Sequence, residues 1–255
     1  QKVKVKMIST NNGMQHHLHI KNGDVGKYVI LPGDPFRTDL IASFLEEPEC
    51  IAHNREHKTW SGYLLGERVS VTSTGMGCPS TAIAVEELIR CGADTFIRVG
   101  NAGAVRDFKE REVFDGVIVS AAVRDEGTTR QYVPIEYPAI ANRFIVEALS
   151  KSAKEEGKSF LEGIAHCKDS FYGEVEPENV PLEYVLRQRW EVWKRSNVIC
   201  SEMETSALFV VSSLRGVRAG AIMNWGDMES TIKIACRAVE HLIEEDRKSG
   251  KIPDR

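Results

Sequence analysis

TFIRVGNAG, residues 95–103, is the stretch around which this chain is organised. Its β-branched and aromatic first half predicts a buried strand, and Gly100 and Gly103 predict a turn directly after it. Arg98 lies within the apolar half, where an unpaired guanidinium is costly to bury. Because backbone N–H groups in a glycine turn can face an anion, we interpret the stretch as presenting Arg98 and the turn to a phosphate. The alternative is a core strand whose arginine extends along apolar surface to the sheet edge.

The composition limits the class of protein and its partners. The chain has 255 residues, of which 42% are hydrophobic and 27% charged, and its net charge is −4. This length fits one large α/β domain or two small ones; without a visible linker or repeat, we expect one domain over residues 1–255, frayed over 1–14. The net charge and the absence of a basic patch argue against nucleic acid and anionic membranes as partners.

Cysteine usage and hydropathy predict the compartment. The six cysteines form no CxxC pair, which predicts a reduced, cytoplasmic protein with neither a zinc site nor a disulfide framework. No apolar run reaches the length of a membrane span, and the first residues do not resemble a signal peptide. We therefore expect no membrane partner.

Strand and helix patterns alternate along the chain. The expected strands are residues 28–31, 60–64, 68–73, 95–99, 116–123, 163–167, 198–200 and 217–223. The expected helices are residues 38–45, 80–91, 139–152, 184–194, 206–214 and 229–247. This alternation predicts an α/β fold with a mixed, largely parallel sheet and helices on both faces.

A second glycine turn, PGDPFR at residues 32–37, joins an expected strand to an expected helix. A strand, a glycine turn and a helix start form an anion-binding geometry, to which Arg37 adds formal charge. It is not a Walker motif, because GxxxxGK[ST] is absent. The alternative is an ordinary strand-to-helix turn with an exposed arginine.

Carboxylates and histidines give further candidates. Glu202 and Glu204, two residues apart at a helix start, would not share one helix face, so one can face substrate while the other packs elsewhere. Alternatively, the two carboxylates only stabilise the helix start through its dipole. The histidines of residues 15–19 lack acidic or thiol ligands at metal spacing. We expect a surface loop there, or one histidine that meets a substrate hydroxyl.

Six motifs, in order, resemble one known family: GDPFR, NREHKTWSGY, STGMGCPSTAIAVEELI, FIRVGNAGAV, DSFYG and SEMETSALF. They are similar to the nucleoside phosphorylase-I family, and within it to the bacterial uridine-type enzymes, over roughly residues 14–247. The resemblance implies a three-layer α/β/α fold with a partly barrel-like sheet. It also implies a pentosyltransferase that converts uridine and phosphate to uracil and ribose 1-phosphate, with inorganic phosphate as co-substrate and no organic cofactor.

The resemblance also assigns site residues. Phosphate would be bound by Gly33, Arg37, Arg98 and Asn101, with Arg55 from a neighbouring subunit. Ribose would be bound by Met203 and Glu204, with His17 of the neighbour at the 5′-hydroxyl. The base would be bound by Gly103, Phe171, Glu174 and Glu202. Arg98, Glu204 and Arg37 would carry the catalysis.

The family further implies a homo-oligomer whose active sites are shared between paired subunits, with a dimer as the minimum unit and a hexamer as the full assembly. A monovalent cation, K⁺, would lie at a subunit interface on Glu56, Met76 and Ser80. Oxygen ligands suit such a hard cation. The alternative is that Glu56 only pairs with a nearby basic residue.

The sequence departs from the uridine-type pattern in three places. Asn101 stands where the family usually has Thr or Ser; its amide N–H can still donate to phosphate. Glu174 and Glu176 stand where Gln and Arg, which would bind the uracil edge, are expected. Either Glu174 points away from the base, or its carboxyl group is protonated, or the base is a purine rather than uracil. The chain passes almost directly from a strand to the last helix near Asn224, so either a base-covering loop is truncated or residues are missing from the sequence. Asp227 is then a weak candidate for the general acid of purine-specific relatives.

The departure at Glu174 keeps purine nucleoside phosphorylase as the alternative function. A nucleosidase that uses water would not need Arg37, Arg55 and Arg98. A non-catalytic nucleoside-binding protein would need neither these arginines nor Glu204. We expect Arg98→Ala to remove phosphate use with the fold intact, and a monomer to be inactive.

Overall fold

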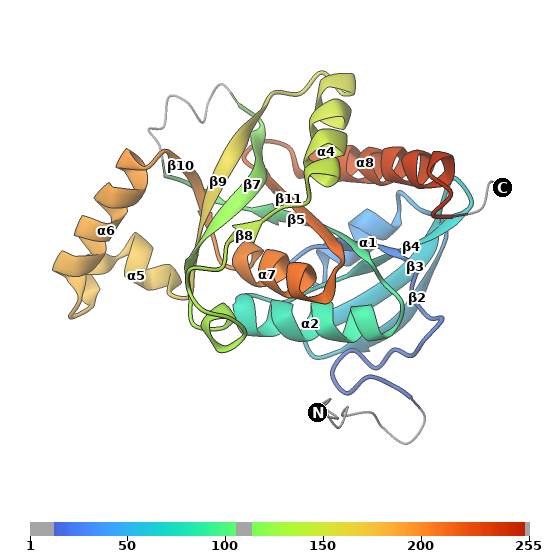
Figure 1. The fold of residues 1–255 in the computed structure, drawn as a ribbon, viewed down its shortest axis with the longest axis horizontal. Coiled ribbons are helices and arrows are strands. Elements are labelled where there is room, and N and C mark those ends of the chain that lie inside the picture. Colours follow the sequence, from blue (N-terminus) through green and yellow to red (C-terminus); the bar gives the residue numbers. More distant parts are fainter. Residues whose placement is uncertain (1–12, 106–113, 253–255) are drawn as a thin grey trace.

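The computed structural model describes residues 13–105 and 114–252, so most of the segment expected to fray lies outside the described residues. In the described part, one sheet of eleven strands is flanked by helices (Figure 1). The strands are β1 (Tyr28–Leu31), β2 (Glu46–Asn54), β3 (His57–Leu64), β4 (Glu67–Thr72), β5 (Thr95–Asn101), β6 (Gly103–Ala104), β7 (Gly116–Asp125), β8 (Ala139–Ile140), β9 (Phe160–Lys168), β10 (Val198–Glu202) and β11 (Arg218–Asn224). The helices are α1 (Arg37–Ala42), α2 (Cys78–Arg90), α4 (Arg143–Glu155), α5 (Phe171–Val175), α6 (Glu183–Arg195), α7 (Thr205–Arg215) and α8 (Met228–Lys248).

Two helix pairs form the outer layers of the fold. Helices α2 and α7 pack together on one face of the sheet, and α4 and α8 pack together on the other (Figure 1). Strand β5 contributes to both cores, with Phe96 on the α2–α7 side and Ile97 and Val99 on the α4–α8 side. Because side chains alternate along a strand, Arg98 lies on the same side as Phe96, toward α2 and α7.

The sheet is mixed and closes partly on itself. Its strand order is β2-β3-β4-β1-β5-β11-β7-β9-β10-β6, with β8 attached to β7. β5 runs through Ala102 into β6, and β6 pairs antiparallel with β10 at the far end of this order. In the order β5-β11-β7-β9-β10-β6, these strands therefore form a partial barrel. This arrangement confirms the predicted fold class. Parallel pairing is less dominant than we predicted, because β11–β7 and the β2–β3–β4 pairings are antiparallel.

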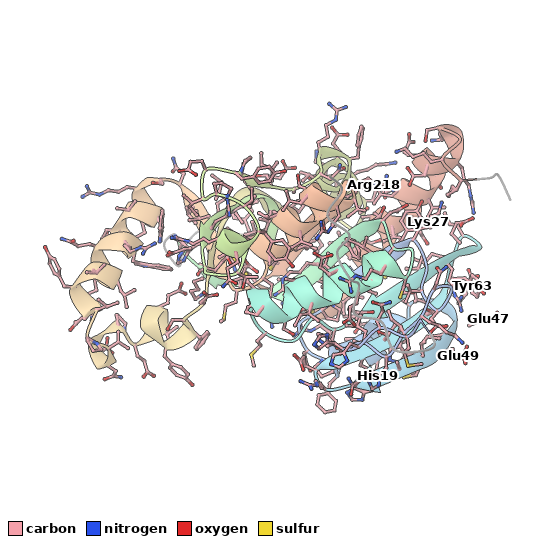
Figure 2. The ribbon with its side chains drawn as sticks, turned by 60° about the horizontal axis from the view of Figure 1, so that its bottom comes forward. His19, Lys27, Glu47, Glu49, Tyr63 and Arg218 are labelled. Atoms are coloured by element: carbon pink, nitrogen blue, oxygen red, sulfur yellow. The ribbon has the colours of Figure 1, made fainter. Side chains whose placement is uncertain are left out.

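The β2–β3 hairpin is larger than the sequence predicted. Only residues 60–64 were expected as a strand, but β3 begins at His57 and β2 precedes it from Glu46. β2 is an edge strand, and Glu47 and Glu49 lie at the rim of the molecule (Figure 2). Their exposure removes the apolar alternation by which a strand is recognised, while charge and Pro48 protect the edge from further pairing.

Two other segments differ from their predicted structure. Residues 139–152 were expected as one helix, but β8 comes first and α4 begins after Asn142, whose side chain accepts a hydrogen bond from the Phe144 N–H at 3.1 Å. Phe171–Val175 is the short helix α5, which is absent from the helices expected above; it is capped by Ser170, whose Oγ accepts from the Gly173 N–H at 3.0 Å. In both cases a cap residue fixes the helix start.

The membrane prediction can be compared with the helices directly. Within residues 13–105 and 114–252, no helix combines the length and the apolar character needed to cross a bilayer.

Candidate active site

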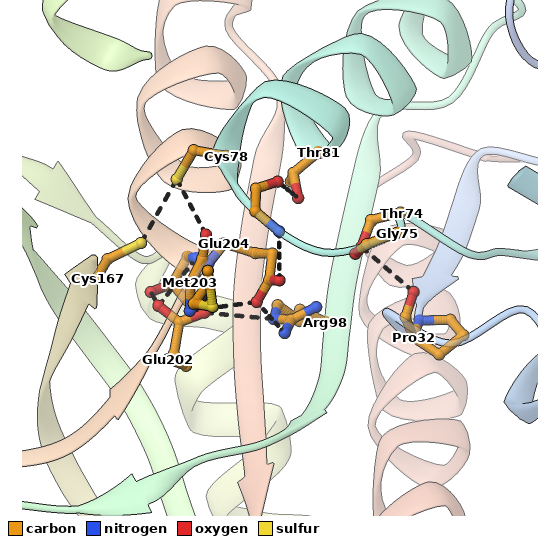
Figure 3. Close-up of polar contacts among 12 residues, drawn as sticks. Pro32, Thr74, Gly75, Cys78, Thr81, Arg98, Cys167, Glu202, Met203 and Glu204 are labelled. Atoms are coloured by element: carbon orange, nitrogen blue, oxygen red, sulfur yellow. Dashed lines mark hydrogen bonds and ion pairs between the residues drawn. The ribbon is translucent and has the colours of Figure 1, made fainter. Parts of the chain in front are cut away.

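The glycine turns predicted from the sequence meet at one edge of the sheet. Strands β1, β4 and β5 are parallel neighbours, so their carboxyl ends lie together. The turns after β1 and β4 are joined by two backbone hydrogen bonds, from Thr74 N–H to the Pro32 carbonyl at 2.8 Å and from Gly75 N–H to the Gly33 carbonyl at 3.0 Å. Figure 3 shows Thr74 and Gly75 next to Pro32. A cavity of about 700 Å³ opens over this edge.

Most of the predicted site residues line this cavity. They are Gly33, Arg37, Glu56, Met76, Arg98, Asn101, Gly103, Phe171, Glu174, Glu202, Met203 and Glu204. Lys168 and Ser201, which the sequence reasoning missed, line it as well. His17, Arg55 and Ser80 are not among its lining residues.

Arg98 is the buried cation at the centre of the site. Its Nη2 donates to Glu204 Oε2, and its Nε lies 3.5 Å from Glu202 Oε2 (Figure 3). The side chain is only 5% exposed, yet Nε and Nη1 have no hydrogen-bond partner among the described residues. Nη1 faces the turn after β1, since a Cβ built on Gly33 would lie 3.9 Å from it. An uncompensated, buried N–H group beside a glycine turn is suited to an anion.

Arg37 adds a second positive charge at this edge. It is the first residue of α1, and burial lowers its pKa; the nearby charge of Arg98 lowers it further, against the opposing effect of Asp34. Two guanidinium groups that repel each other in one cavity favour a multiply charged anion between them.

Glu204 and Met203 are held in place by the start of α2. Glu204 Oε1 accepts a hydrogen bond from the Gly77 N–H at 2.7 Å, and the Cys78 thiol donates to the Met203 carbonyl at 3.2 Å (Figure 3). Gly77 has a φ of 90°, a conformation that L side chains rarely adopt. The glycine therefore allows the N–H to reach Glu204, which fixes a carboxylate at the cavity wall.

Glu202 lines the cavity, but its carboxylate is bound mainly to its own chain. It was assigned to the base, but its carboxylate accepts hydrogen bonds from the Glu204 N–H at 2.7 Å and from the N–H of Thr205 at 2.9 Å, and the Thr205 hydroxyl also donates to it. Burial and the neighbouring Glu204 raise its pKa. With both oxygens occupied, Glu202 anchors the start of α7 and faces Arg98. These contacts favour a role in supporting Arg98, and base binding by Glu202 stays a prediction.

Glu174 lies at the end of the cavity assigned to the base. Its Oε1 is 3.1 Å from Lys168 Nζ, and its Oε2 accepts a hydrogen bond from the Ser201 hydroxyl at 2.5 Å. Burial alone would raise the pKa of Glu174, but His166, Lys168 and Ser201 outweigh it and the pKa is lowered. An ionised Glu174 in the cavity wall contradicts two of the alternatives, namely that it points elsewhere and that it is protonated.

A signal for Lys168 was present in the sequence. His166-Cys167-Lys168 alternates basic, apolar and basic side chains at the end of a strand, so both basic groups lie on one face. Cys167 faces the other way, with its Sγ 3.5 Å from Cys78 Sγ in the core. Basic pairs at the carboxyl end of a buried strand are candidates for a site.

His17 and Arg55 lie together outside the cavity. Asn54, next to Arg55, donates from Nδ2 to the His17 carbonyl at 2.7 Å. His17 Nδ1 is 2.7 Å from Glu87 Oε1, and Glu87 also accepts from the N–H of His17 and of Leu18. Glu87, which the sequence reasoning missed, therefore orients the imidazole and leaves its Nε2 for another partner.

The predicted cation ligands are only partly assembled in one chain. The Ser80 hydroxyl lies 2.9 Å from Glu56 Oε1 and also contacts the Thr74 carbonyl, while the Met76 side chain is 85% exposed. Glu56 Oε1 also lies 3.7 Å from His57 Nε2, as the alternative pairing expected. Among the described residues, no group of three or more His, Cys, Asp or Glu could hold a metal ion.

The short connection near Asn224 is closed by ordered contacts. Trp225 donates from Nε1 to the Ala102 carbonyl at 3.1 Å, over the turn that joins β5 to β6. Asp227 caps α8 by accepting from the N–H of Ser230 at 2.9 Å, and hydrogen bonds from Ser230 lower its pKa. An ionised capping carboxylate has no proton to donate, which argues against Asp227 as a general acid.

A mixed, partly closed sheet with two arginines and a carboxylate at the ends of its parallel strands defines an α/β protein whose cavity combines both charges. Comparison with known proteins gives the family. The family model of the phosphorylase superfamily matches residues 27–248. A uridine phosphorylase of Treponema pallidum is 41% identical over 91% of this chain and 95% of the relative. A guanosine phosphorylase of Halorubrum lacusprofundi is 38% identical over 82% of this chain and 81% of the relative.

A solved structure agrees with these sequence matches. The crystal structure of uridine phosphorylase from Vibrio fischeri is similar with a TM-score of 0.81 and 31% identity, over 92% of this chain and 99% of that chain. The chain belongs to the phosphorylase superfamily, which confirms the resemblance inferred from the six motifs.

Proposed function

We propose that the chain is a nucleoside phosphorylase that converts uridine and inorganic phosphate to uracil and ribose 1-phosphate. The observation that carries this proposal is the buried Arg98, whose Nη1 lacks a partner among the described residues, beside Arg37 in one cavity. Uridine as substrate is supported by the names of the relatives from Treponema pallidum and Vibrio fischeri.

The phosphate is the nucleophile of this reaction. Arg98, Arg37 and the turn at Gly33 bind and orient the phosphate below the sugar, with Asn101 as a further donor. As the bond between C1′ and the base nitrogen lengthens, positive charge develops on the sugar. A phosphate oxygen then forms the new bond to C1′, and the base leaves with the electron pair of the broken bond.

The ribose is oriented from the opposite wall. Glu204 accepts hydrogen bonds from the sugar hydroxyls, and its negative charge favours the cation that develops on the ring. Because Gly77 and Arg98 already hold its two oxygens, the carboxylate needs little reorganisation when substrate binds. Met203 and Phe171 contribute contact surface along the sugar and base.

A substrate panel tests the function. Base release is measured by ultraviolet absorbance or chromatography for uridine, thymidine, cytidine, inosine, guanosine and adenosine, each with and without phosphate. Phosphate-dependent release from uridine supports the proposal. Release without phosphate would instead identify a nucleosidase, and binding without release would identify a nucleoside-binding protein.

A purine nucleoside is the second candidate substrate. The relative from Halorubrum lacusprofundi is named a guanosine phosphorylase, and Glu174 stands where the uridine-type pattern has glutamine. Hypoxanthine and guanine carry an N–H beside a carbonyl, as uracil does. Phosphate-dependent release from inosine or guanosine alone would favour this candidate.

We further propose that paired subunits of a hexamer share their active sites. The exposed Arg55 and the histidine His17 lie on one edge outside the cavity, where they can serve a neighbouring subunit. Light scattering tests the assembly, and a monomer with full activity would contradict it.

Complementation gives a sharper prediction for shared sites. Arg37→Ala and Arg55→Ala should each inactivate the enzyme, but dimers that contain one copy of each should have one intact site. Co-expression without selection for mixed pairs should therefore give about a quarter of wild-type activity, because half of randomly formed pairs are mixed and one of the two sites in each mixed pair is intact. If each site is built from one chain, the mixture stays inactive.

A monovalent cation at the same interface is a separate proposal. Glu56 and Ser80 supply two neighbouring side-chain oxygens, and a symmetric partner would double this number. We expect the rate to rise when K⁺ replaces N-methylglucamine, and Glu56→Gln to remove this response. An identical rate in both salts would contradict the cation site.

The remaining proposals concern the number of domains and the cellular compartment. One continuous sheet and a family match over residues 27–248 support a single domain, for which calorimetry should give one unfolding transition. The six free thiols support a reducing, cytoplasmic location, which cell fractionation tests.

A further inference from the structure

Lys168 and Glu174 form an ion pair in the wall between two cavities. The 700 Å³ cavity that contains Arg98 and a neighbouring cavity of about 610 Å³ share both residues. Lys168 is only 7% exposed and donates from Nζ to the Ser201 hydroxyl at 2.8 Å, with Glu174 Oε1 at 3.1 Å. An ammonium group has three N–H donors, so within the described residues one of them is left for a ligand.

A second set of charged side chains contacts Glu174 of this ion pair. His166 Nδ1 lies 3.4 Å from Glu174 Oε2, and His166 Nε2 lies 2.9 Å from Asp125 Oδ2. Asp125 in turn pairs with Arg189 of α6. Burial would lower the pKa of His166, but Asp125 and Glu174 outweigh it and the pKa is raised. The carboxylates on both sides of His166 favour its protonated form, and through these contacts His166 holds Glu174 in position.

We propose that Lys168 and Glu174 together bind the base edge, with Glu174 accepting the ring N–H and Lys168 donating to the adjacent carbonyl oxygen. This inference rests on the proposed phosphorolysis. The ion pair then presents one acceptor and one donor side by side, as the amide of a glutamine would. Its ligands are bases with an N–H next to a carbonyl, namely uracil and thymine, and by the same pattern hypoxanthine and guanine.

The pair also affects the chemical step. When the bond from C1′ to the base breaks, the electron pair moves to the base and spreads to its carbonyl oxygens, while the phosphate oxygen takes its place at C1′. Lys168 stabilises this anion, and it offsets the repulsion that Glu174 alone would exert. Lys168 is therefore assigned as a catalytic residue, and His166 as a positioning residue that acts through Glu174.

The test compares two leaving groups in Lys168→Met. 5-Fluorouracil is a better leaving group than uracil, so 5-fluorouridine needs less stabilisation of its departing anion. We expect kcat/KM to fall by about 100-fold for uridine and only about 10-fold for 5-fluorouridine, with the KM for phosphate unchanged. Lys168→Arg should restore part of the loss for uridine. Lys194→Met, which removes an exposed lysine outside the substrate cavity, serves as the matched control.

The outcomes separate this inference from the proposed function. Equal losses for both nucleosides would overturn the leaving-group role of Lys168, while an inactive wild type would overturn the function itself. If Lys168→Met does not fold, the double variant Lys168→Met/Glu174→Gln removes both buried charges. The two nucleosides are then compared in this double variant. The amide introduced by Glu174→Gln is a weaker electrostatic donor than the ammonium of Lys168. In this double variant, the ratio of kcat/KM for 5-fluorouridine to kcat/KM for uridine must therefore still exceed the wild-type ratio.

Discussion

Arg98→Ala is expected to lower kcat/KM for phosphate by about 10³-fold or more, because it removes the buried donors that bind the developing phosphate ester. Nη1 and Nε of Arg98 have no hydrogen-bond partner among residues 13–105 and 114–252. Nη1 is therefore available to the anion without breaking an existing hydrogen bond, whereas Nε faces the Glu202 carboxylate at 3.5 Å. The loss should appear at every nucleoside concentration, since the nucleoside does not replace the missing charge.

The structure also changes the expected effect of this substitution on stability. The sequence suggested that the fold would remain intact, but Arg98 lies between Glu202 and Glu204, whose side chains are 1% and 6% exposed. Removal of the cation leaves two buried carboxylates uncompensated, which costs about 3–5 kcal/mol. We therefore expect the thermal midpoint to fall together with activity.

Phosphate-induced stabilisation separates these two effects. A bound ligand adds about 2.7 kcal/mol to the free energy of unfolding of the wild type at a hundred times its Kd, which raises the thermal midpoint. Arg98→Ala should lose this response below its own unfolding temperature, while replacement of the exposed Arg195 by alanine should retain it. Undiminished stabilisation of Arg98→Ala by phosphate would contradict the role assigned to Arg98.

Glu204→Gln is expected to lower kcat by about 10²–10³-fold, mainly through loss of negative charge beside the sugar cation. The glutamine carbonyl can still accept the Gly77 N–H that now binds Oε1. The geometry of the α2 start is therefore largely kept, and the substitution tests charge rather than position. Because the sugar charge develops only in the transition state, the KM for uridine should change much less than kcat.

The two substitutions should differ in their response to phosphate. Glu204→Gln leaves Arg98 and Arg37 in the cavity and removes a competing carboxylate, so phosphate should still raise its thermal midpoint. Glu191→Gln, on the exposed face of α6, is the matched control and should behave as the wild type. A raised KM with unchanged kcat would mean that Glu204 only binds the ground state.

The sequence predicted those parts of the site that are close together in the chain. The apolar strand that contains Arg98, the glycine turns at Gly33 and Gly100, and the helix start at Glu204 are each signalled by local patterns. These residues needed only a strand to end or a helix to begin at the right position. The alternation of strands and helices predicted that much of the sheet is parallel, as it is between β1, β4 and β5, but not the order of these strands.

Assignments that depended on neighbours from other strands were less successful. Glu202 and Glu204 have the same side-chain chemistry, and only the approach of Thr205, Gly77 and Arg98 decides that one supports the site and the other faces the cavity. Lys168 was missed because its partners, Ser201 and Glu174, come from β10 and α5. The charged edge strand β2 was missed because exposure removes its apolar alternation.

The sequence by itself determined the elements, the glycine turns and the positions of the arginines, because backbone propensity and hydrophobic periodicity act over a few residues. Only the tertiary structure decided which groups share the cavity. The antiparallel pairing of β6 with β10 closes the sheet and brings Arg98 of β5 against Glu204, which follows β10 at the start of α7. That contact joins residues about a hundred positions apart, and its geometry is set by the packing of the whole barrel rather than by any local pattern.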